Sequence, residues 1–315
     1  MQEKIKKTRN DTKRVSVVIV TYRSEKDIYD CLASLFKWAD IPREELEVIV
    51  VDNNSPEADR MFNGIRRIYG DEIVLVNNTN NGGYGQGNNV GIRRAKAPVI
   101  MIMNPDVRLN SHVFNHALSI FAQKQYVGIY GLTQMVSENR KCGTSFNTTH
   151  MMNGYLRILL TGISNRFNIF LPSCMYVSGA CFFIRRDSFE KAGLFDESIF
   201  MYGEEDDVWY RMRRIGQKTM FDASSTYIHL TEERKTDANY ELKMLRSVMY
   251  VNSKYGFPVI RTLREERRSL HILRFRQWLK SFISGRGYEL DVYREYDGLI
   301  RQMIKEERKR KSEKI

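Results

Sequence analysis

Residues 47–55, with the sequence EVIVVDNNS, decide the fold expected for this chain. The first five residues form a short run rich in valine and isoleucine, which is typical of a buried strand. The turn cluster DNNS follows, so Asp52 stands at the end of that strand. Ligands of a doubly wound parallel sheet bind beside the carboxyl ends of its strands. The stretch therefore predicts an α/β sheet with a carboxylate at its binding edge.

Comparable apolar runs lie on both sides of this stretch, and helical patterns alternate with them. Val15–Thr21 reads VSVVIVT and predicts the first strand, and Ser24 begins a helix in which the apolar residues of 28–36 recur at helical spacing. Further strands are expected at residues 73–76, 99–103, 127–130, 176–184, 220–221 and 226–229. Further helices are expected at residues 88–95, 111–124, 205–215 and 237–255. This alternation predicts βαβ units and a mostly parallel sheet flanked by helices.

Length and composition set the class of protein. The 315 residues leave room for one large α/β domain and an appendage, and a hydrophobic content of 42% suits a globular core. No apolar run approaches the ~20 residues that span a bilayer, and the basic N-terminus lacks the apolar part of a signal peptide. The four cysteines have no zinc-binding or redox spacing. We therefore expect a cytoplasmic protein with reduced cysteines.

The net charge of +12 lies mainly at the two ends of the chain. Residues 1–14 carry six basic and two acidic side chains, and residues 258–315 carry sixteen and nine. The long central part, 15–257, is therefore nearly neutral. A nucleic-acid-binding core would carry the charge itself, so we expect no nucleic-acid partner. Basic ends on a neutral body favour an anionic membrane surface or another polyanion.

The C-terminal part differs from the rest of the chain in its pattern of apolar and basic residues. From about residue 262, apolar and aromatic residues alternate with arginines, which predicts a basic amphipathic helix that ends at Gly285 and Gly287. A second helix at 288–307 leads to basic residues at 308–311. We expect this region to hold the protein at the inner membrane face; packing on the central domain, or on a second subunit of a homo-oligomer, is the alternative. The chain thus divides into a basic tail, a central α/β domain and a helical C-terminal region, at residues 1–14, 15–235 and 236–315.

Acidic residues stand where such a sheet places a site. Asp52 and Asp106 each follow a strand, and the run EEDD at 204–207 opens a helix. Mg²⁺ or Mn²⁺ held by one or two carboxylates and by substrate phosphates is the usual arrangement at a diphosphate. Each Asp alone is better explained as a turn cap, and the acidic run alone is equally well explained as a helix start. Four adjacent acids also repel one another unless a cation or base is near, which suits a general base.

The segment 81–91, NGGYGQGNNVG, predicts a loop whose backbone approaches a ligand closely. Its G-x-G spacing also occurs in dinucleotide sites, but it follows the third strand rather than the first, and no acidic strand end follows about twenty residues later. A plain flexible loop is the alternative. His229 ends an extended run. It becomes a candidate metal ligand because other residues already predict a cation site; otherwise it is better explained as a structural histidine.

Several short motifs follow one another in order along the chain. They read VVIVTY at 17–22, EVIVVDNNS at 47–55, the segment 81–91, MNPD at 103–106, SGA at 178–180, GLFDE at 193–197, FMYGEEDD at 200–207, and His229. Together they resemble the family 2 glycosyltransferases with the GT-A fold, especially the rhamnosyltransferase-like branch. The resemblance covers about two-thirds of the chain. It implies that 15–235 is a catalytic domain of the hexosyltransferase class, which moves a sugar from a nucleotide diphosphate donor to an acceptor hydroxyl.

The resemblance also implies which residues contact the nucleotide sugar. These are Thr21, Tyr22, Arg23, Asp52, Asn81, Gly83, Tyr84, Asn104 and Asp106. Within this set, Asp52 would read the pyrimidine ring. Arg23 stands where the family often has Asn, and it would instead reach a donor phosphate.

Metal binding and catalysis are implied for the remaining matches. Asp106 is the one carboxylate left of the family's Asp-x-Asp motif, and His229 would complete the site for Mg²⁺ or Mn²⁺. Glu205 stands at the position of the catalytic base, where Asp is common, with Glu204 as its neighbour. The implied mechanism inverts the anomeric carbon: the base removes the acceptor proton as the hydroxyl attacks, and the metal stabilises the leaving diphosphate.

The resemblance implies a dTDP- or UDP-sugar as donor, with dTDP-rhamnose as one candidate. The acceptor would be a glycan or a lipid-linked hydroxyl in cell-surface polysaccharide synthesis, and we expect residues 132–172 and the far C-terminus to shape its site. A nucleotidyltransferase of related fold is one alternative, but the sequence YRSE at 22–25 lacks the glycine-rich loop that such enzymes carry after the first strand. A non-catalytic polyanion-binding protein is another, although it would have no use for the ordered acidic motifs.

Overall fold

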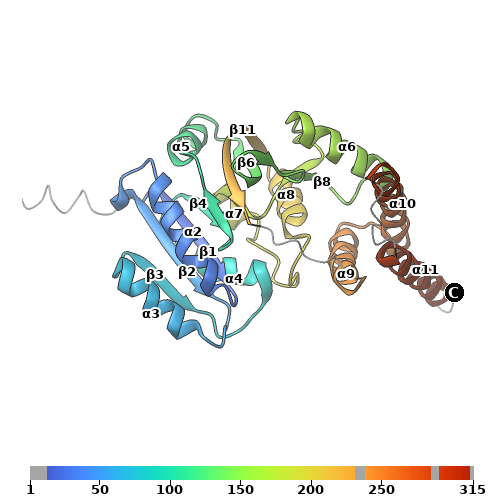
Figure 1. Cartoon of the computed structure of the whole chain (residues 1–315), viewed down its shortest axis with the longest axis horizontal. Helices are drawn as coiled ribbons and strands as arrows, with labels where there is room; N and C mark the ends of the chain where they lie inside the picture. Colours follow the sequence, from blue (N-terminus) through green and yellow to red (C-terminus); the bar gives the residue numbers. More distant parts are fainter. Residues whose placement is uncertain (1–12, 231–237, 285–290, 313–315) are drawn as a thin grey trace, which may run out of the picture.

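The structure, a computed structural model, describes residues 13–230, 238–284 and 291–312. Within these residues a nine-stranded sheet has the order β3-β2-β1-β4-β10-β6-β11-β5, and β7 pairs with β6 outside that order. Helices cover the sheet, and α9, α10 and α11 lie to one side of it (Figure 1). The strands are β1 (Val15–Thr21), β2 (Leu46–Asp52), β3 (Ile73–Asn77), β4 (Val99–Met103), β5 (Val107–Leu109), β6 (Val127–Ser137), β7 (Arg140–Lys141), β8 (Phe146–Thr148), β9 (Met175–Val177), β10 (Cys181–Arg185) and β11 (Lys218–His229). The helices are α2 (Glu25–Trp38), α3 (Ala58–Tyr69), α4 (Gly83–Ile92), α5 (Phe114–Gln123), α6 (Gly154–Phe167), α7 (Arg186–Lys191), α8 (Glu204–Arg214), α9 (Ala238–Lys254), α10 (Val259–Ser284) and α11 (Asp291–Ser312), with a 3₁₀ turn at Arg43–Glu45.

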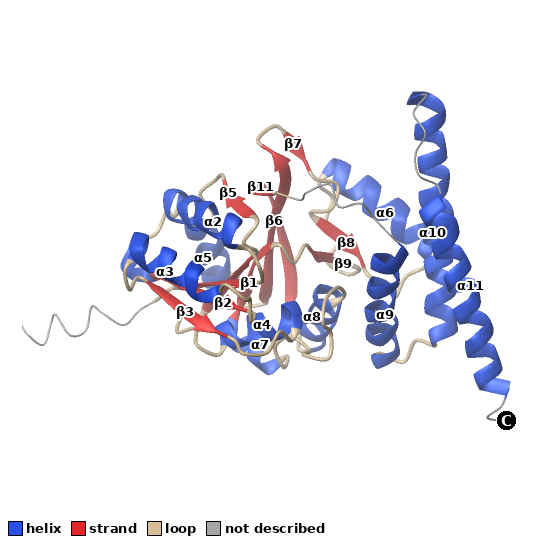
Figure 2. Cartoon of the chain, turned by 60° about the horizontal axis from the view of Figure 1, so that its bottom comes forward, coloured by secondary structure: helices blue, strands red, loops and turns tan. Residues whose placement is uncertain are grey.

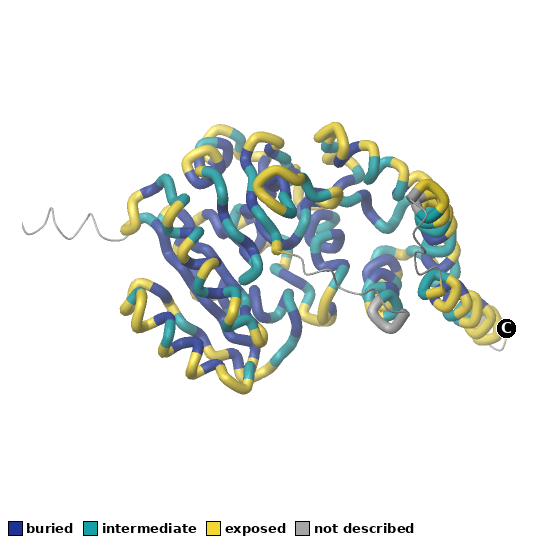
Figure 3. Tube along the Cα trace, viewed as in Figure 1, coloured by how far each residue is buried: buried dark blue, intermediate teal, exposed yellow. Residues whose placement is uncertain are grey.

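The two faces of the sheet explain the apolar runs of the sequence. Val17 and Ile19 of β1 pack with residues of α2, α3 and α5, whereas Val18 packs with residues of α4, α7 and α8. Neighbouring side chains of a strand point to opposite faces, so a strand covered on both faces is apolar throughout. Every residue of β2 is buried. Figure 3 shows this burial concentrated in the sheet and the inner sides of its helices. The expected α/β fold is confirmed.

Strand direction places the ends of the strands. Parallel pairing joins β1 to β2, β1 to β4, β2 to β3 and β6 to β11. The strand β10 runs against both β4 and β6, so β6 and β11 point the same way as β4. The sheet is therefore mostly parallel, as expected, and most of its strands end at the same edge.

Some local expectations were wrong. The segment 81–91 is mainly the helix α4 rather than a loop, and 176–184 contains two strands, β9 and β10, that belong to different sheets. The two short pieces expected within 220–229 are one strand, β11, which is irregular midway. Ser24 precedes α2 as expected, but its hydroxyl donates to the Tyr22 carbonyl at 3.2 Å instead of capping the helix.

The helices α9, α10 and α11 form a small core of their own. Its buried residues are Leu245, Leu263, Leu270, Tyr296, Ile300 and Ile304. The helix expected from residue 262 is confirmed as part of α10, which also packs against α6 (Figure 2). No helix in the described ranges is both long enough and apolar enough to cross a bilayer. The break expected at Gly285 and Gly287, the domain boundary at 235, and residues 1–12 of the basic tail lie outside the described residues.

Candidate active site

The carboxyl ends of β1, β2, β4 and β11 lie along one edge of the sheet. The strand β1 pairs with β2 on one side, with Thr21 opposite Asp52, and with β4 on the other side. Because β10 is antiparallel to β4, with Cys181 opposite Met103, the turn that precedes β10 lies at this edge too. Neighbouring strands are about 4.8 Å apart, so Asp52 and the turn after β4 are separated by about 10 Å. The topology thus gathers the residues that follow these strands.

Asp52 is buried at the end of β2, and three hydrogen bonds hold its carboxylate. Its Oδ1 accepts from Thr21 Oγ1 at 3.0 Å and from Ser55 Oγ at 2.7 Å, and its Oδ2 accepts from Ser55 N at 2.6 Å. A carboxylate oxygen accepts two hydrogen bonds, so Oδ2 keeps one acceptor position for a ligand. Asp52 also lines a cavity of about 510 Å³, which is within the roughly 300–1,000 Å³ of small-molecule sites.

The turn after β1 reaches this cavity through Arg23. Tyr22 is exposed, and Arg23 lines the cavity together with Asp52 and Ser55. Arg23 has φ of 55°, a left-handed conformation that non-glycine residues rarely adopt. Its backbone N donates to Ser55 Oγ at 2.8 Å, and its guanidinium lies 5.4 Å from the centre of the Tyr22 ring. The turn after β1 therefore places a cation and an aromatic ring beside Asp52.

The helix α4 brings Tyr84 to the same edge. Gly83 at its start has φ of 90°, and a Cβ there would lie 1.9 Å from the carbonyl oxygen of Phe200, so only glycine fits. Tyr84 N donates to that carbonyl at 3.0 Å, and Tyr84 OH donates to the Gly179 carbonyl at 2.6 Å. Asn81 Oδ1 accepts from Gly83 N at 3.3 Å. Tyr84, one of the residues predicted to contact the nucleotide sugar, thus links α4 to the turn before β10.

Asp106 and His229 come together from two separate strands. The strand β5 directly follows Asp106 and pairs with the end of β11, which places Val107 opposite His229. His229 Nε2 lies 3.2 Å from Asp106 Oδ2. Asp106 Oδ1 and His229 Nδ1 are buried without a hydrogen-bond partner. A carboxylate and a ring nitrogen that face each other at this distance fit two ligands of one divalent cation, which would take its other ligands from a diphosphate and water.

These two residues are a minimal ligand set. No group of three or more His, Cys, Asp or Glu side chains suited to a metal ion occurs in the part of the chain that the structure describes. A cation at Asp106 and His229 would therefore depend on substrate oxygens for most of its coordination. Such shared coordination is usual for Mg²⁺ at nucleotide phosphates.

The turn at 178–180 connects the strand ends to α8. Asn104 N donates to the Ala180 carbonyl at 2.8 Å, which ties this turn to the one after β4. On the other side, Glu205 accepts a hydrogen bond from the backbone N–H of Gly179. A Cβ on Gly179 would lie 2.2 Å from Glu205 Oε1, so the absence of a side chain there leaves room for the carboxylate. Glu205 is thereby held at the same edge as Asp106.

The acidic run at the start of α8 does not act as one group. Asp207 is fully buried and pairs with Arg211 at 2.6 Å and Lys254 at 2.7 Å. Asp206 accepts from the backbone N of His150 at 2.9 Å. Successive residues of a helix point about 100° apart, which separates the four carboxylates. The four acids therefore have different partners, although the charges of Asp206 and Asp207 still raise the pKa of Glu205 and Glu204 respectively.

Burial sets the protonation of these two glutamates. Burial raises the pKa of Glu204 well above its usual range, and the neighbouring charge of Glu205 adds to this. Burial also raises the pKa of Glu205; hydrogen bonds from backbone N–H groups oppose this shift, and the charge of Asp206 adds to it. Adjacent carboxyl groups titrate as a coupled pair. Glu205 is the member of the pair that contacts the turn at the sheet edge, through Gly179, and it is therefore the one placed to accept a proton there.

His150 was not predicted as a site residue. Its ring Nδ1 lies 3.3 Å from Asp206 Oδ2 and 3.4 Å from Tyr176 OH, next to the glutamate pair. It belongs to the segment 132–172, whose irregular sequence gave no periodic signal. Ser55, which holds Asp52, was also missed as a contributor, although it is part of the turn cluster DNNS.

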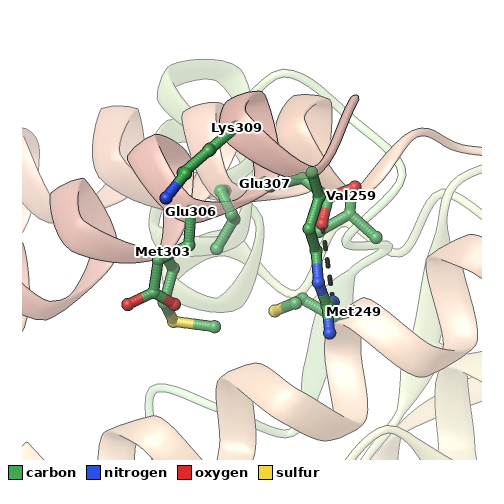
Figure 4. Close-up of a pocket in the computed structure, with 8 residues that line it drawn as sticks. Met249, Val259, Met303, Glu306, Glu307 and Lys309 are labelled. Carbon is green, nitrogen blue, oxygen red and sulfur yellow. Dashed lines mark ion pairs between the residues drawn. The ribbon is translucent and has the colours of Figure 1, made fainter. Parts of the chain in front are cut away.

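A hollow of about 400 Å³ between α9, α10 and α11 lies apart from this site (Figure 4). Its lining residues are Met249, Val259, Leu263, Met303, Glu306, Glu307, Lys309 and Arg310. Arg310 pairs with Glu307, three residues before it on α11, at 4.0 Å. None of the predicted site residues lines this hollow.

Comparison with known proteins identifies relatives of the chain. The profile of the family described as glycosyltransferase-like family 2 matches residues 13–249. The low-salt glycan biosynthesis hexosyltransferase Agl10 of Haloferax volcanii is 29% identical over 220 residues, which are 66% of this chain and 66% of that protein. A poly(ribitol-phosphate) beta-glucosyltransferase of Bacillus spizizenii is 32% identical over 99 residues, which are 31% of this chain and 16% of that protein. The chain thus spans just under two-thirds of the first relative and a small part of the second.

The fold is shared with solved structures. A mannosyltransferase from Pyrobaculum calidifontis, solved with GDP-Man and Mn²⁺, superimposes with a TM-score of 0.59 at 15% identity, over 93% of this chain and 85% of that one. This likeness confirms the GT-A fold that the sequence motifs implied. With the profile matching residues 13–249, which is more than half of its length, the chain belongs to glycosyltransferase family 2.

Proposed function

We propose that this glycosyltransferase moves a hexosyl group from a nucleotide diphosphate sugar to an acceptor hydroxyl in the synthesis of a cell-surface glycan. One observation carries the proposal: Asp52 beside a cavity, the pair Asp106 and His229, and Glu205 beside Gly179 lie along one edge of the sheet. A nucleoside, a diphosphate and a sugar follow one another along such a donor. The three features match these three parts in order.

The nucleoside end of the donor is assigned to Asp52 and its neighbours. The free acceptor position on Asp52 Oδ2 suits the ring N–H of uracil or thymine, which favours UDP- or dTDP-sugars. Thr21 and Ser55 orient this carboxylate, and the exposed ring of Tyr22 offers a stacking surface. Arg23 supplies a cation beside the same cavity for a donor phosphate.

The diphosphate is assigned to Asp106 and His229, which would hold Mg²⁺ or Mn²⁺. When bound, the ion neutralises charge that develops on the leaving diphosphate. The approach of His229 Nε2 to within 3.2 Å of Asp106 Oδ2, beside the unpartnered Asp106 Oδ1, supports this assignment. A Mn²⁺ complex of the structurally similar mannosyltransferase agrees with it at the level of the fold.

Glu205 is the proposed base. It takes the proton of the acceptor hydroxyl as that oxygen bonds to the anomeric carbon and the bond from that carbon to the diphosphate oxygen breaks. One displacement of this kind inverts the anomeric centre without a sugar–enzyme intermediate. A carboxylate whose pKa is raised by burial is a better proton acceptor near neutral pH than an exposed one. Glu204 is buried beside it, and the charge on either glutamate raises the tendency of the other to hold a proton.

The sugar and acceptor are proposed from the relatives and the sequence. A hexose is supported by the hexosyltransferase of Haloferax volcanii and the glucosyltransferase of Bacillus spizizenii to which the chain is similar. Rhamnose, suggested by the sequence motifs, belongs to the same size class. The acceptor is a glycan or a lipid-linked saccharide reached from the cytoplasmic side of a membrane.

A calorimetric titration with UDP and dTDP, with and without Mn²⁺, tests the donor site. Binding of either nucleotide that is strengthened by Mn²⁺ in the wild type and weakened in Asp106→Ala supports the proposal. A panel of UDP-sugars and dTDP-sugars, including dTDP-rhamnose, scored by transfer or slow hydrolysis, then identifies the donor. Failure of both nucleotides to bind would contradict the proposed donor class.

A further inference from the structure

The helix α6 turns an apolar stripe away from the body of the protein. Its members recur at steps of three and four residues, and all are exposed: Leu156, Leu159, Ile163 and Phe167. The opposite side of α6 makes the contacts with the body, where Asn165 Nδ2 donates to the Phe146 carbonyl at 2.8 Å and Thr161 Oγ1 accepts from Thr148 N at 3.1 Å. A helix that only covered the sheet would turn its apolar side inward. These four residues form the outer stripe.

The C-terminal end of α10 carries a second exposed apolar group. It consists of Phe275, Trp278, Leu279, Phe282 and Ile283. Phe282 is 77% exposed and Ile283 is 74% exposed. The three rings of the group stack along the helix, with centroids 5.8 Å and 5.9 Å apart. These five residues form the aromatic end.

The outer stripe and the aromatic end adjoin, because α6 and α10 pack against each other (Figure 2). Arg157 of α6 donates to Glu266 Oε2 at 2.7 Å and to Ser269 Oγ at 2.8 Å on α10. Tyr155, beside the outer stripe, lies 3.4 Å from His271, which is one turn before the aromatic end. The two exposed apolar groups thus lie on helices that pack against each other.

Both surfaces belong to segments without negative charge. Between Glu138 and Asp187 the chain has six basic residues and no acidic one. From Arg267 to Ser284, α10 carries five basic residues and no acidic one. Apolar side chains flanked by arginine and lysine are characteristic of helices that lie in the interface of anionic membranes.

A pocket of about 360 Å³ opens beside the aromatic end, between α10 and α11. Its lining residues are His271, Arg274, Phe275, Trp278 and Arg294. Guanidinium groups bind phosphate oxygens with matched geometry, and the two aromatic rings offer an apolar wall. Arg294 also pairs with the exposed Asp291 at 3.0 Å, outside this lining. The pocket has the chemistry of a site for a lipid phosphate.

We propose that the outer stripe and the aromatic end form a surface that docks on an anionic lipid bilayer, with a lipid phosphate in the pocket beside α10. The aromatic rings enter the interface while the arginines stay at the level of the headgroups. A second copy of the chain fits less well, because a symmetric contact would press one basic surface against another. Docking of this kind is separate from the transfer reaction and does not depend on the donor.

Vesicle flotation of the full chain measures the docking. Vesicles of phosphatidylcholine alone are compared with vesicles that contain about one-third phosphatidylglycerol. The wild type is expected to float with the anionic vesicles, to bind the neutral ones weakly, and to lose binding at high salt. Replacing Phe282 and Ile283 together by Ser should lower the partition coefficient about 100-fold. Arg274→Glu with Arg276→Glu should remove the preference for anionic vesicles.

A matched control replaces two exposed apolar residues that do not belong to this surface. Ile68, which is 60% exposed on α3 at the other end of the molecule (Figure 1), and exposed Tyr126 are replaced by Ser; flotation should not change. UDP binding by every variant should match the wild type, which separates this proposal from that of the donor site. Absence of wild-type flotation, or equal flotation of the Phe282 and Ile283 variant, would overturn the proposal. A wild-type dimer that this variant dissociates would instead assign the surface to a second copy.

Discussion

Replacing Gly179 by Ala is expected to disable Glu205 and leave the donor site intact. The three atoms nearest to the added Cβ all belong to Glu205, and Oε1 would lie only 2.2 Å away. Ordinary contacts begin at 3.4 Å, so the carboxylate must move by about 1 Å. A misplacement of about 1 Å costs a reaction about 100-fold. We therefore expect kcat to fall about 100-fold, with UDP affinity changed less than about twofold.

Single-turnover transfer gives the rate, and calorimetry with UDP and Mn²⁺ gives the affinity. Gly143→Ala is the matched control, because a Cβ at Gly143 would meet nothing within 4 Å. Combining Gly179→Ala with Glu205→Asp shortens the displaced side chain and should recover part of the lost rate. A Gly179→Ala enzyme with the kcat of the wild type would refute the reasoning that this close contact positions the base.

Three further predictions concern metal binding, pH and stability. Asp106→Ala should weaken Mn²⁺-dependent UDP binding about 10- to 100-fold in calorimetry; an unchanged metal dependence would remove Asp106 from the metal site. Because burial raises the pKa of Glu205 and the base must be ionised, the transfer rate should rise as pH increases through that raised pKa and then level off; a flat rate–pH profile on the acid side would contradict its role. Lys254→Met leaves the buried Asp207 with one fewer cationic partner, so the free energy of unfolding in urea should fall by about 1–3 kcal/mol; an unchanged value would assign the pairing to Arg211 alone.

The sheet edge was predictable from the sequence because its strands are buried on both faces. Such strands read as continuous apolar runs, and the polar residue that ends each run marks the carboxyl edge. Asp52 and Asp106 were found in this way, and the structure places both at that edge. The order of the motifs then supplied Glu205 and His229, which lie far from them in the sequence.

The remaining features depend on packing that the sequence does not display. The helix α4 was not recognised in the sequence because its glycines have low helix propensity. A Cβ at Gly91 would come within 2.5 Å of Val18, so the small residue allows this helix to lie close to β1. The turn at 178–180 was hidden inside one apolar run, because β9 and β10 are both buried and nothing in their composition separates them. His150 reaches Asp206 through a tertiary contact across 56 residues, for which no local pattern exists.

Transfer by Glu205→Gln, measured in a single turnover beside its affinity for UDP, tests most directly whether this sheet edge is a glycosyl transfer site. Gln has nearly the shape of Glu and can keep the contact with Gly179, but it cannot accept the acceptor's proton. We expect UDP binding like that of the wild type and a transfer rate reduced by about 10²- to 10⁴-fold. Transfer at the rate of the wild type would show that the proton leaves by another route and would contradict the assignment of Glu205 as the base.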